Sequence, residues 1–212
     1  MQPSKRLCNQ VRGLLAEFGI IINQGISALR KRLPEILEDG ENELHWVFRD
    51  ALALKYEQLC QLDTLVNKLT KLIENDAKQH DQIKQLQSIP GFGAIVASTF
   101  FCVIGDGKSF SKGRDVSASL GLVPRQHSSG GKNTLLGISK RGDKYLRSLL
   151  VHGARAVVNH AHKKDDALNL WVTRLVKTRG KNKATVALAN KLARIAWAVT
   201  TSGKAYQQNF SI

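Results

Sequence analysis

Two adjacent serines stand where a reactive hydroxyl is most easily accommodated in this chain. Ser128 and Ser129 precede two glycines, which leave the backbone free to approach a ligand closely. Arg125 and Lys132 flank the pair, and such cations stabilise the negative charge that develops when a phosphodiester is attacked. Nucleophilic attack by a serine hydroxyl is therefore one interpretation of this segment. A plain serine-glycine linker is the other.

The acidic residues do not suggest a nuclease centre. Metal-dependent cleavage of DNA needs two or more carboxylates that hold divalent cations. The second half of the chain has five aspartates and no glutamate, and Asp115, Asp143, Asp165 and Asp166 are read more simply as helix N-caps or first-turn charges. The histidines and the three cysteines lack the spacing of zinc or redox sites. We therefore expect no metal site and no cofactor in this chain.

A Pro-Gly-x-Gly turn at residues 90–93 separates two apolar segments. Gly91 and Gly93 permit unusual backbone angles and leave the amides at the start of the next helix free to face an anion. This pattern is typical of a helix-hairpin-helix motif, which binds a phosphate and reads no base sequence. The same turn also occurs as a purely structural corner, so both interpretations stay open.

The positive charge of the chain is confined to its second half. The formal net charge is +15, from 32 Lys and Arg against 17 Asp and Glu. Acidic and basic residues balance over residues 1–104, so the whole excess lies in residues 105–212. A basic surface kept only for solubility would not need this segregation, which indicates a polyanionic partner such as nucleic acid. We expect four closely spaced cations to contact phosphates: Lys140, Arg141, Lys144 and Arg147.

Most of the apolar periodicity is helical, so we expect a mostly α fold. A helical lead segment at 1–48 and a long helix or coiled coil at 49–87 should precede an α-helical DNA-binding domain at 88–212, which contains the helix-hairpin-helix. No Gly or Pro interrupts residues 44–87. Within them a heptad seam is formed by Leu59, Leu62, Val66, Leu69 and Ile73. The seam spans two heptads, which is compatible with an intermolecular coiled coil or with a helix that packs on its own domain.

Local signals predict the shorter elements. Residues 10–18 should form a helix. A second helix should open near residue 25, and Pro34 should mark a break or a new start. Residues 125–131 should form a loop. Later helices should begin after Asp143, after Asp165 or Asp166, and at residue 184. No run of residues is long and apolar enough to span a membrane, and the cysteines fit a reducing, cytoplasmic setting.

Three segments in combination resemble one family of transposases. They are Ile-Pro-Gly-Phe-Gly at 89–93, Ala-Ser-Leu-Gly-Leu-Val-Pro-Arg-Gln-His-Ser-Ser-Gly-Gly-Lys at 118–132, and Gly-Ile-Ser-Lys-Arg-Gly-Asp-Lys-Tyr-Leu-Arg at 137–147. Together they are similar to the C-terminal domain of the IS one-ten family, subgroup one-eleven-eleven, whose members are DEDD transposases. Residues 9–19 resemble the segment that follows the nuclease domain in those proteins.

The resemblance implies an organisation in which catalytic groups come from two domains. Full-length members begin with a RuvC-like domain that carries four acidic residues and magnesium; a coiled-coil region and a serine-bearing C-terminal domain follow. They use a structured guide RNA from the element to pair donor and target DNA. The family serine corresponds to Ser129, with Ser128 as the adjacent alternative. The acidic domain and its magnesium would lie outside this chain, which we therefore expect to be inactive by itself.

The leading hypothesis is a DNA-binding C-terminal part of an insertion-sequence transposase that contributes a serine nucleophile to a composite site. The alternative is a non-catalytic nucleic-acid-binding fragment, or an accessory or interfering protein. A third hypothesis is a helical scaffold that oligomerises through residues 52–73. The expected partners are DNA, a guide RNA from the element, and another copy of the chain or a full-length transposase. We expect a cytoplasmic, nucleoid-associated protein without membrane contact.

Overall fold

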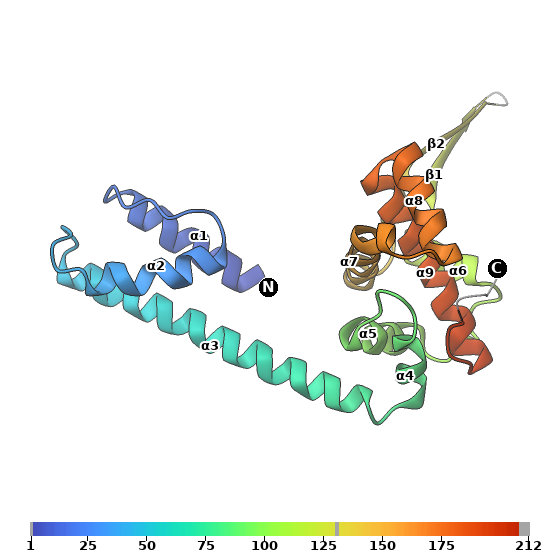
Figure 1. Cartoon of the computed structure of the whole chain (residues 1–212), viewed down its shortest axis with the longest axis horizontal. Helices are drawn as coiled ribbons and strands as arrows, with labels where there is room; N and C mark the ends of the chain where they lie inside the picture. The colour runs from blue at the N-terminus through green and yellow to red at the C-terminus, as the bar shows by residue number, and fades with distance from the viewer. Residues whose placement is uncertain (1, 130–131, 208–212) are drawn as a thin grey trace. The chain divides into compact units, whose positions relative to one another are not determined.

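The computed structural model describes residues 2–129 and 132–207, without the side chains of residues 2, 3, 127–129, 132, 133 and 135. The chain divides into two compact units, residues 1–71 and 72–212 (Figure 1). Helices make up most of both units, which confirms the mostly α fold class. The division into three segments expected from the sequence remains a prediction. Within the described ranges, every helix is too short or too polar to cross a bilayer.

The first unit contains α1 (Gln2–Ala16), α2 (Ile26–Glu38) and most of α3 (Trp46–Ala77). These three helices enclose a small apolar core. The buried members of that core are Leu7, Cys8, Val11, Leu15, Ile22, Leu29, Leu33, Ile36, Leu44, Leu52 and Leu59. Because Leu7 and Cys8 extend the buried face of α1 toward its N-terminus, this helix begins well before residue 10, where the sequence predicted its start.

The expected break or new helix start at Pro34 is wrong, because α2 runs through this residue. Proline lacks an amide hydrogen and therefore removes one hydrogen bond from the helix. Leu33 and Ile36, on either side of the proline, are both buried and hold this turn on the core. The helix also starts at Ile26 behind Gly25, whose positive φ of 119° makes the preceding turn.

The long helix expected over residues 44–87 is interrupted. α3 ends at Ala77, and α4 (Asp81–Gln87) begins after His80, whose backbone is extended with φ −107° and ψ 110°. The buried Ile83 and Leu86 of α4 belong to the core of the second unit. Burial of these two side chains, and not any glycine or proline in the sequence, accounts for the change of direction.

The heptad seam on α3 is only partly used inside the chain. Leu59 is buried in the core of the first unit and Leu62 packs against it. Farther along the helix, the exposed fractions are 47% for Val66, 58% for Leu69 and 36% for Ile73. The first part of the seam therefore packs on its own unit, and no described residue buries the side chains of the second part. The coiled coil remains a prediction.

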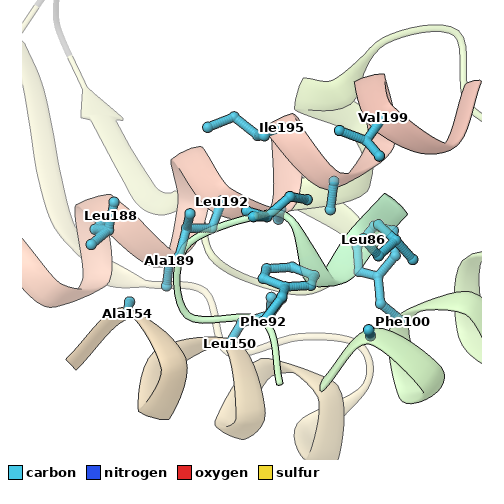
Figure 2. Packing of buried hydrophobic residues seen from close by; sticks show 14 of the residues in the cluster. Leu86, Phe92, Phe100, Leu150, Ala154, Leu188, Ala189, Leu192, Ile195 and Val199 are labelled. Atoms are coloured by element: carbon cyan, nitrogen blue, oxygen red, sulfur yellow. The ribbon is translucent and has the colours of Figure 1, made fainter. Parts of the chain in front are cut away.

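The second unit is a helical bundle centred on α9 (Lys181–Ser202), which packs against α4, α6, α7 and α8. Alanines and leucines of α9 meet Phe92, Phe100 and Leu150 in the core (Figure 2). Small side chains on α9 allow the neighbouring helices to approach closely. The other helices are α5 (Ala94–Ile104), α6 (Gly113–Ser119), α7 (Lys144–His160), the 3-10 turn η1 (Ala161–Lys163) and α8 (Ala167–Arg179).

The sequence predicted a loop at residues 125–131, but its described part, residues 125–129, belongs to a strand; residues 130 and 131 lie outside the described part. β1 (Pro124–Ser129) pairs antiparallel with β2 (Lys132–Ile138), with an irregularity between Pro124 and Gln126. The pair extends away from the helices of its unit (Figure 1). Every strand side chain that the structure describes is exposed or half-buried. With neither face buried, the sequence has no reason to alternate between polar and apolar residues, so the usual strand signal is missing.

Aspartates cap two of the helices in the second unit. The Asp143 side chain accepts the backbone amide of Leu146 at 2.5 Å, which confirms the expected cap of α7. Asp166, and not Asp165, caps α8 by accepting the amide of Asn169 at 3.1 Å. Partial burial acts to raise the pKa of Asp166, but hydrogen bonds from Asn169 and neighbouring amides outweigh it and hold that pKa below its ordinary value.

Candidate nucleic-acid interface

The two segments that flank the β1–β2 hairpin are tied to each other by backbone contacts at its base. The amide of Ser139 donates to the carbonyl of Val123 at 2.8 Å, and the amide of Lys140 donates to that of Gly121 at 3.1 Å. Gly121 has φ +67°, and a Cβ atom there would lie 2.2 Å from the carbonyl oxygen of Arg141. Only glycine fits this crossing, which therefore fixes the direction in which the hairpin leaves the bundle.

Arg147 reinforces the same junction. Its Nη1 lies 3.0 Å from the carbonyl oxygen of Leu120, at the end of α6, and 2.9 Å from that of Arg141. The guanidinium thus joins the segments that precede and follow the hairpin through charge-assisted hydrogen bonds. Arg147 is half-buried, and its expected contact with phosphate remains a prediction beside this structural role.

The other three cations of the predicted cluster are exposed at the hairpin base. Lys140, Arg141 and Lys144 have exposed side chains, and no carboxylate in the described part of the chain forms an ion pair with them. Lys140 has φ +56° and is the non-glycine residue with a positive φ among those described. A lysine in the left-handed region is strained by about 1–2 kcal/mol, so the surrounding backbone holds it there.

The predicted nucleophile lies near the far end of the hairpin. In the strand register Ser129 is opposite Lys132, and Ser128 is opposite Asn133. The side chains of Ser128, Ser129 and Lys132 lie outside the described part, as do Gly130 and Gly131 entirely. Arg125, near the base of β1, is exposed. The pairing therefore brings the backbones of the two serines and Lys132 together at one end of a ribbon, which the sequence interpretation as a loop did not anticipate.

The turn at residues 90–93 connects α4 to α5, and its two glycines differ in surroundings. Gly91 has φ +85°, and a Cβ atom there would lie 2.7 Å from the carbonyl oxygen of Gly153 on α7. Gly93 is the N-cap of α5 with φ −76°, and a Cβ atom there would meet nothing within 4 Å. Gly91 is thus required for the packing of the turn against α7, whereas Gly93 faces open space at the N-terminus of α5. Phosphate binding at either remains a prediction.

A groove that the sequence did not reveal runs beside the hairpin base. Its volume is about 950 Å³. It is lined by Leu122, Pro124, Leu136, Gly137, Ile138, Lys140, Trp171, Asn182, Lys183, Val186, Ala187, Asn190, Lys191 and Arg194. These residues come from the hairpin, α8 and α9, which are far apart in the chain. Of the residues that line the groove, Lys140 is the one that the sequence singled out as a phosphate contact.

Carboxylates do not gather at this interface. Among the described residues, no three His, Cys, Asp or Glu side chains are grouped in a way that would hold a metal ion. The chemistry that the described side chains offer is therefore electrostatic: exposed cations around a rigid hairpin base, with an aromatic ring nearby.

Comparisons with known proteins agree on one family. Residues 83–168 match the Transposase IS116/IS110/IS902 family. The chain is 41% identical over 201 residues to the transposase for insertion sequence element IS1111A of Coxiella burnetii, covering 95% of this chain and 55% of the relative. It is also 41% identical to a probable family 20 transposase of Pseudomonas aeruginosa, over 95% of this chain and 60% of the relative.

A further relative is the transposase for insertion sequence element IS1328 of Yersinia enterocolitica. It is 41% identical over 201 residues, which cover 94% of this chain and 59% of the relative. The chain thus spans somewhat more than half the length of the curated relatives it matches. The names of these relatives place them among the transposases, two of them for insertion sequence elements. The chain belongs to the IS116/IS110/IS902 family.

Proposed function

We propose that this chain is the DNA-engaging C-terminal part of an insertion-sequence transposase and that Ser129 is its nucleophile in a composite site. The observation that carries the proposal is the hairpin. It holds Ser129 opposite Lys132 at one end and joins at its base to Lys140, Arg141 and Lys144. A strand of DNA bound by cations at the base would lie along a ribbon that ends at a serine.

The distribution of charge supports DNA as the partner. All of the net positive charge lies in residues 105–212. Among the described residues of that half, the Lys108–Asp106 pair is the one ion pair, so its other described cations have no carboxylate partner. Unpaired cations release counterions from DNA when they neutralise phosphates, which drives association. Guide RNA offers the same phosphates, so it is a second expected partner of this surface.

Chemistry at Ser129 requires groups from elsewhere. A serine hydroxyl is a weak nucleophile at neutral pH unless a base or a metal activates it. In the proposed composite site, a separate acidic domain supplies magnesium, which would lower the pKa of the hydroxyl and stabilise the leaving oxygen. This chain contributes the hydroxyl and the cations that hold the phosphate. The purified chain by itself should therefore bind DNA without cutting or joining it.

Binding is tested by fluorescence anisotropy with a labelled DNA duplex over a range of salt concentrations. The affinity should fall steeply with salt, and changing Lys140 and Arg141 together to Ala should reduce the logarithmic salt slope by about 2 on all duplex sequences alike. The matched control changes Lys84 and Lys108 to Ala, because both already pair with aspartates. Binding that does not respond to salt would exclude the electrostatic proposal.

Catalysis is tested by complementation in trans. A full-length relative with its matching serine changed to alanine supplies the acidic domain, and strand joining is measured on the DNA ends of its own element. This chain should restore joining, Ser129→Ala should abolish the rescue, and Ser128→Ala should keep it. Rescue by Ser129→Ala but not by Ser128→Ala would move the nucleophile to Ser128. Rescue by neither wild type nor variant would favour the non-catalytic nucleic-acid-binding alternative.

A further inference from the structure

We infer that the groove between the hairpin base and α9 binds an unpaired strand of DNA. This inference rests on the proposed function, because it assigns a substrate form to a surface continuous with the hairpin. The groove is lined by four cations, Lys140, Lys183, Lys191 and Arg194, together with apolar side chains. Neither Trp171 nor the α9 cations belong to the cluster of basic residues predicted from the sequence.

The cations follow one face of α9. Lys183, Lys191 and Arg194 all line the groove, and no carboxylate among the described residues lines it with them. Lys183 and Arg194 are eleven residues apart, which is about 16 Å along a helix. At the rise of about 3.4 Å per nucleotide of a stacked strand, this length matches four or five successive phosphates. The face is therefore long enough to follow a strand backbone.

The apolar part of the groove favours unpaired bases over a duplex. Leu136, with 45% of its surface exposed, and the partly exposed Val186 and Ala187 line the groove together with Trp171. A duplex stacks its bases on one another and exposes only their edges in the grooves, so the apolar base faces would not reach these side chains. Unpaired bases would instead cover them, since every base has an apolar face.

Trp171 supplies an aromatic ring on which a base of an unpaired strand could stack. Its ring lies at the groove, and the Nζ atom of Lys191 is 5.0 Å from the ring centroid. Single-strand-binding proteins combine cations along the backbone with aromatic rings on which bases stack. The cation–π contact orients the lysine and the ring together before any ligand is bound.

The position of the groove relative to the hairpin fits the proposed reaction. Leu136 lies four residues after Lys132, the register partner of Ser129, which is about 14 Å along an extended strand. A DNA strand seated in the groove could thus continue along the ribbon and reach the serine within a few nucleotides. Strand exchange passes through unpaired DNA ends. A groove that binds such an end would keep it close to the proposed nucleophile, Ser129.

The test uses an oligothymidylate of about twelve nucleotides, which is within the site size of single-strand grooves. Its binding should quench tryptophan fluorescence in the wild-type chain and in Trp46→Phe, whereas Trp171→Phe should lose most of the quenching. Changing Lys183 and Lys191 together to Ala should weaken oligothymidylate binding at least tenfold and affect duplex binding less. The Lys84→Ala and Lys108→Ala pair serves as the control, as above.

Three results would overturn the inference: quenching that survives in Trp171→Phe, a larger loss of duplex binding than of single-strand binding in the lysine pair, or an oligouridylate that binds as tightly as the oligothymidylate. Each leaves the proposed function standing if salt-dependent duplex binding persists. If the chain bound no DNA at low salt, both this inference and the proposed function would be wrong.

Discussion

Gly91 and Gly153 meet backbone to backbone where the turn between α4 and α5 crosses α7. A Cβ atom built on Gly153 would lie 2.3 Å from the carbonyl oxygen of Gly91, far inside van der Waals contact. Phe92, next to this crossing, is buried in the core of the second unit. The close approach therefore sets the position of the whole turn, including Gly93 at the start of α5.

We expect Gly153→Ala to lower the free energy of unfolding by about 1–3 kcal/mol, because the added methyl group must push the turn away from α7. Gly91→Ala should cost more, since its φ of +85° adds backbone strain of about 1–2 kcal/mol. Urea unfolding followed by circular dichroism measures both. Gly93→Ala is the control and should cost less than about 1 kcal/mol, the loss at an N-cap.

The phosphate-binding interpretation of the turn is tested at Gly93 alone. Gly93→Val should keep the chain folded, because its backbone angles are open to any residue and nothing lies within 4 Å of its added Cβ. If the amides at the start of α5 hold a phosphate, the bulk of valine should weaken duplex binding several-fold. Unchanged affinity in the folded variant would make the turn a structural corner only.

Arg147→Ala should destabilise the second unit by about 1.5–3 kcal/mol, the range for hydrogen bonds from a charged donor. Its guanidinium joins the carbonyls of Leu120 and Arg141 at distances of 3.0 and 2.9 Å. Arg155 is exposed on the same helix and provides the control, with an expected change within about 0.5 kcal/mol. Thermal unfolding of the two variants compares them directly; equal stability would show that the bridge contributes nothing.

Self-association through α3 is best tested where the seam is exposed. Changing Val66 and Leu69 together to Glu should convert a dimer to a monomer in light scattering, because both side chains lie on the uncovered part of the seam. Leu62 is avoided, since it packs on the core of its own unit. Thr64→Glu, at an exposed position off the seam, should leave the dimer intact. A monomeric wild type would contradict the coiled-coil prediction.

Asp166→Ala should lower stability by about 1 kcal/mol at neutral pH by removing the cap of α8, and Asp165→Ala should have little effect. The folded-state pKa of Asp166 is below its ordinary value, so the carboxylate stabilises the fold at pH values above about 4. That contribution is lost as pH falls through the lowered pKa. The stability gap between wild type and Asp166→Ala should therefore close in acid. A gap independent of pH would point to a cause other than the ionised cap.

The sequence by itself determined the features that depend on local pattern. Helical periodicity predicted a mostly α chain, and the cap at Asp143 followed from one residue type before an apolar run. Charge segregation indicated a polyanionic partner, and the three motif segments resemble the transposase family that the comparisons identify. Such signals need no knowledge of which segments meet, because each is carried by residues adjacent in the chain.

Tertiary structure alone decided the hairpin, the crossing of the two glycines and the groove. The strand side chains that the structure describes are exposed or half-buried, so pairing of backbones formed a ribbon without a buried face to leave alternation in the sequence. Gly91 and Gly153 are 62 positions apart in the printed sequence, and Lys140 is brought beside Trp171 and Lys191 only when α8 and α9 pack on the bundle. Long-range packing is not encoded in any local window, and for that reason the candidate groove could not be predicted from the residues that line it.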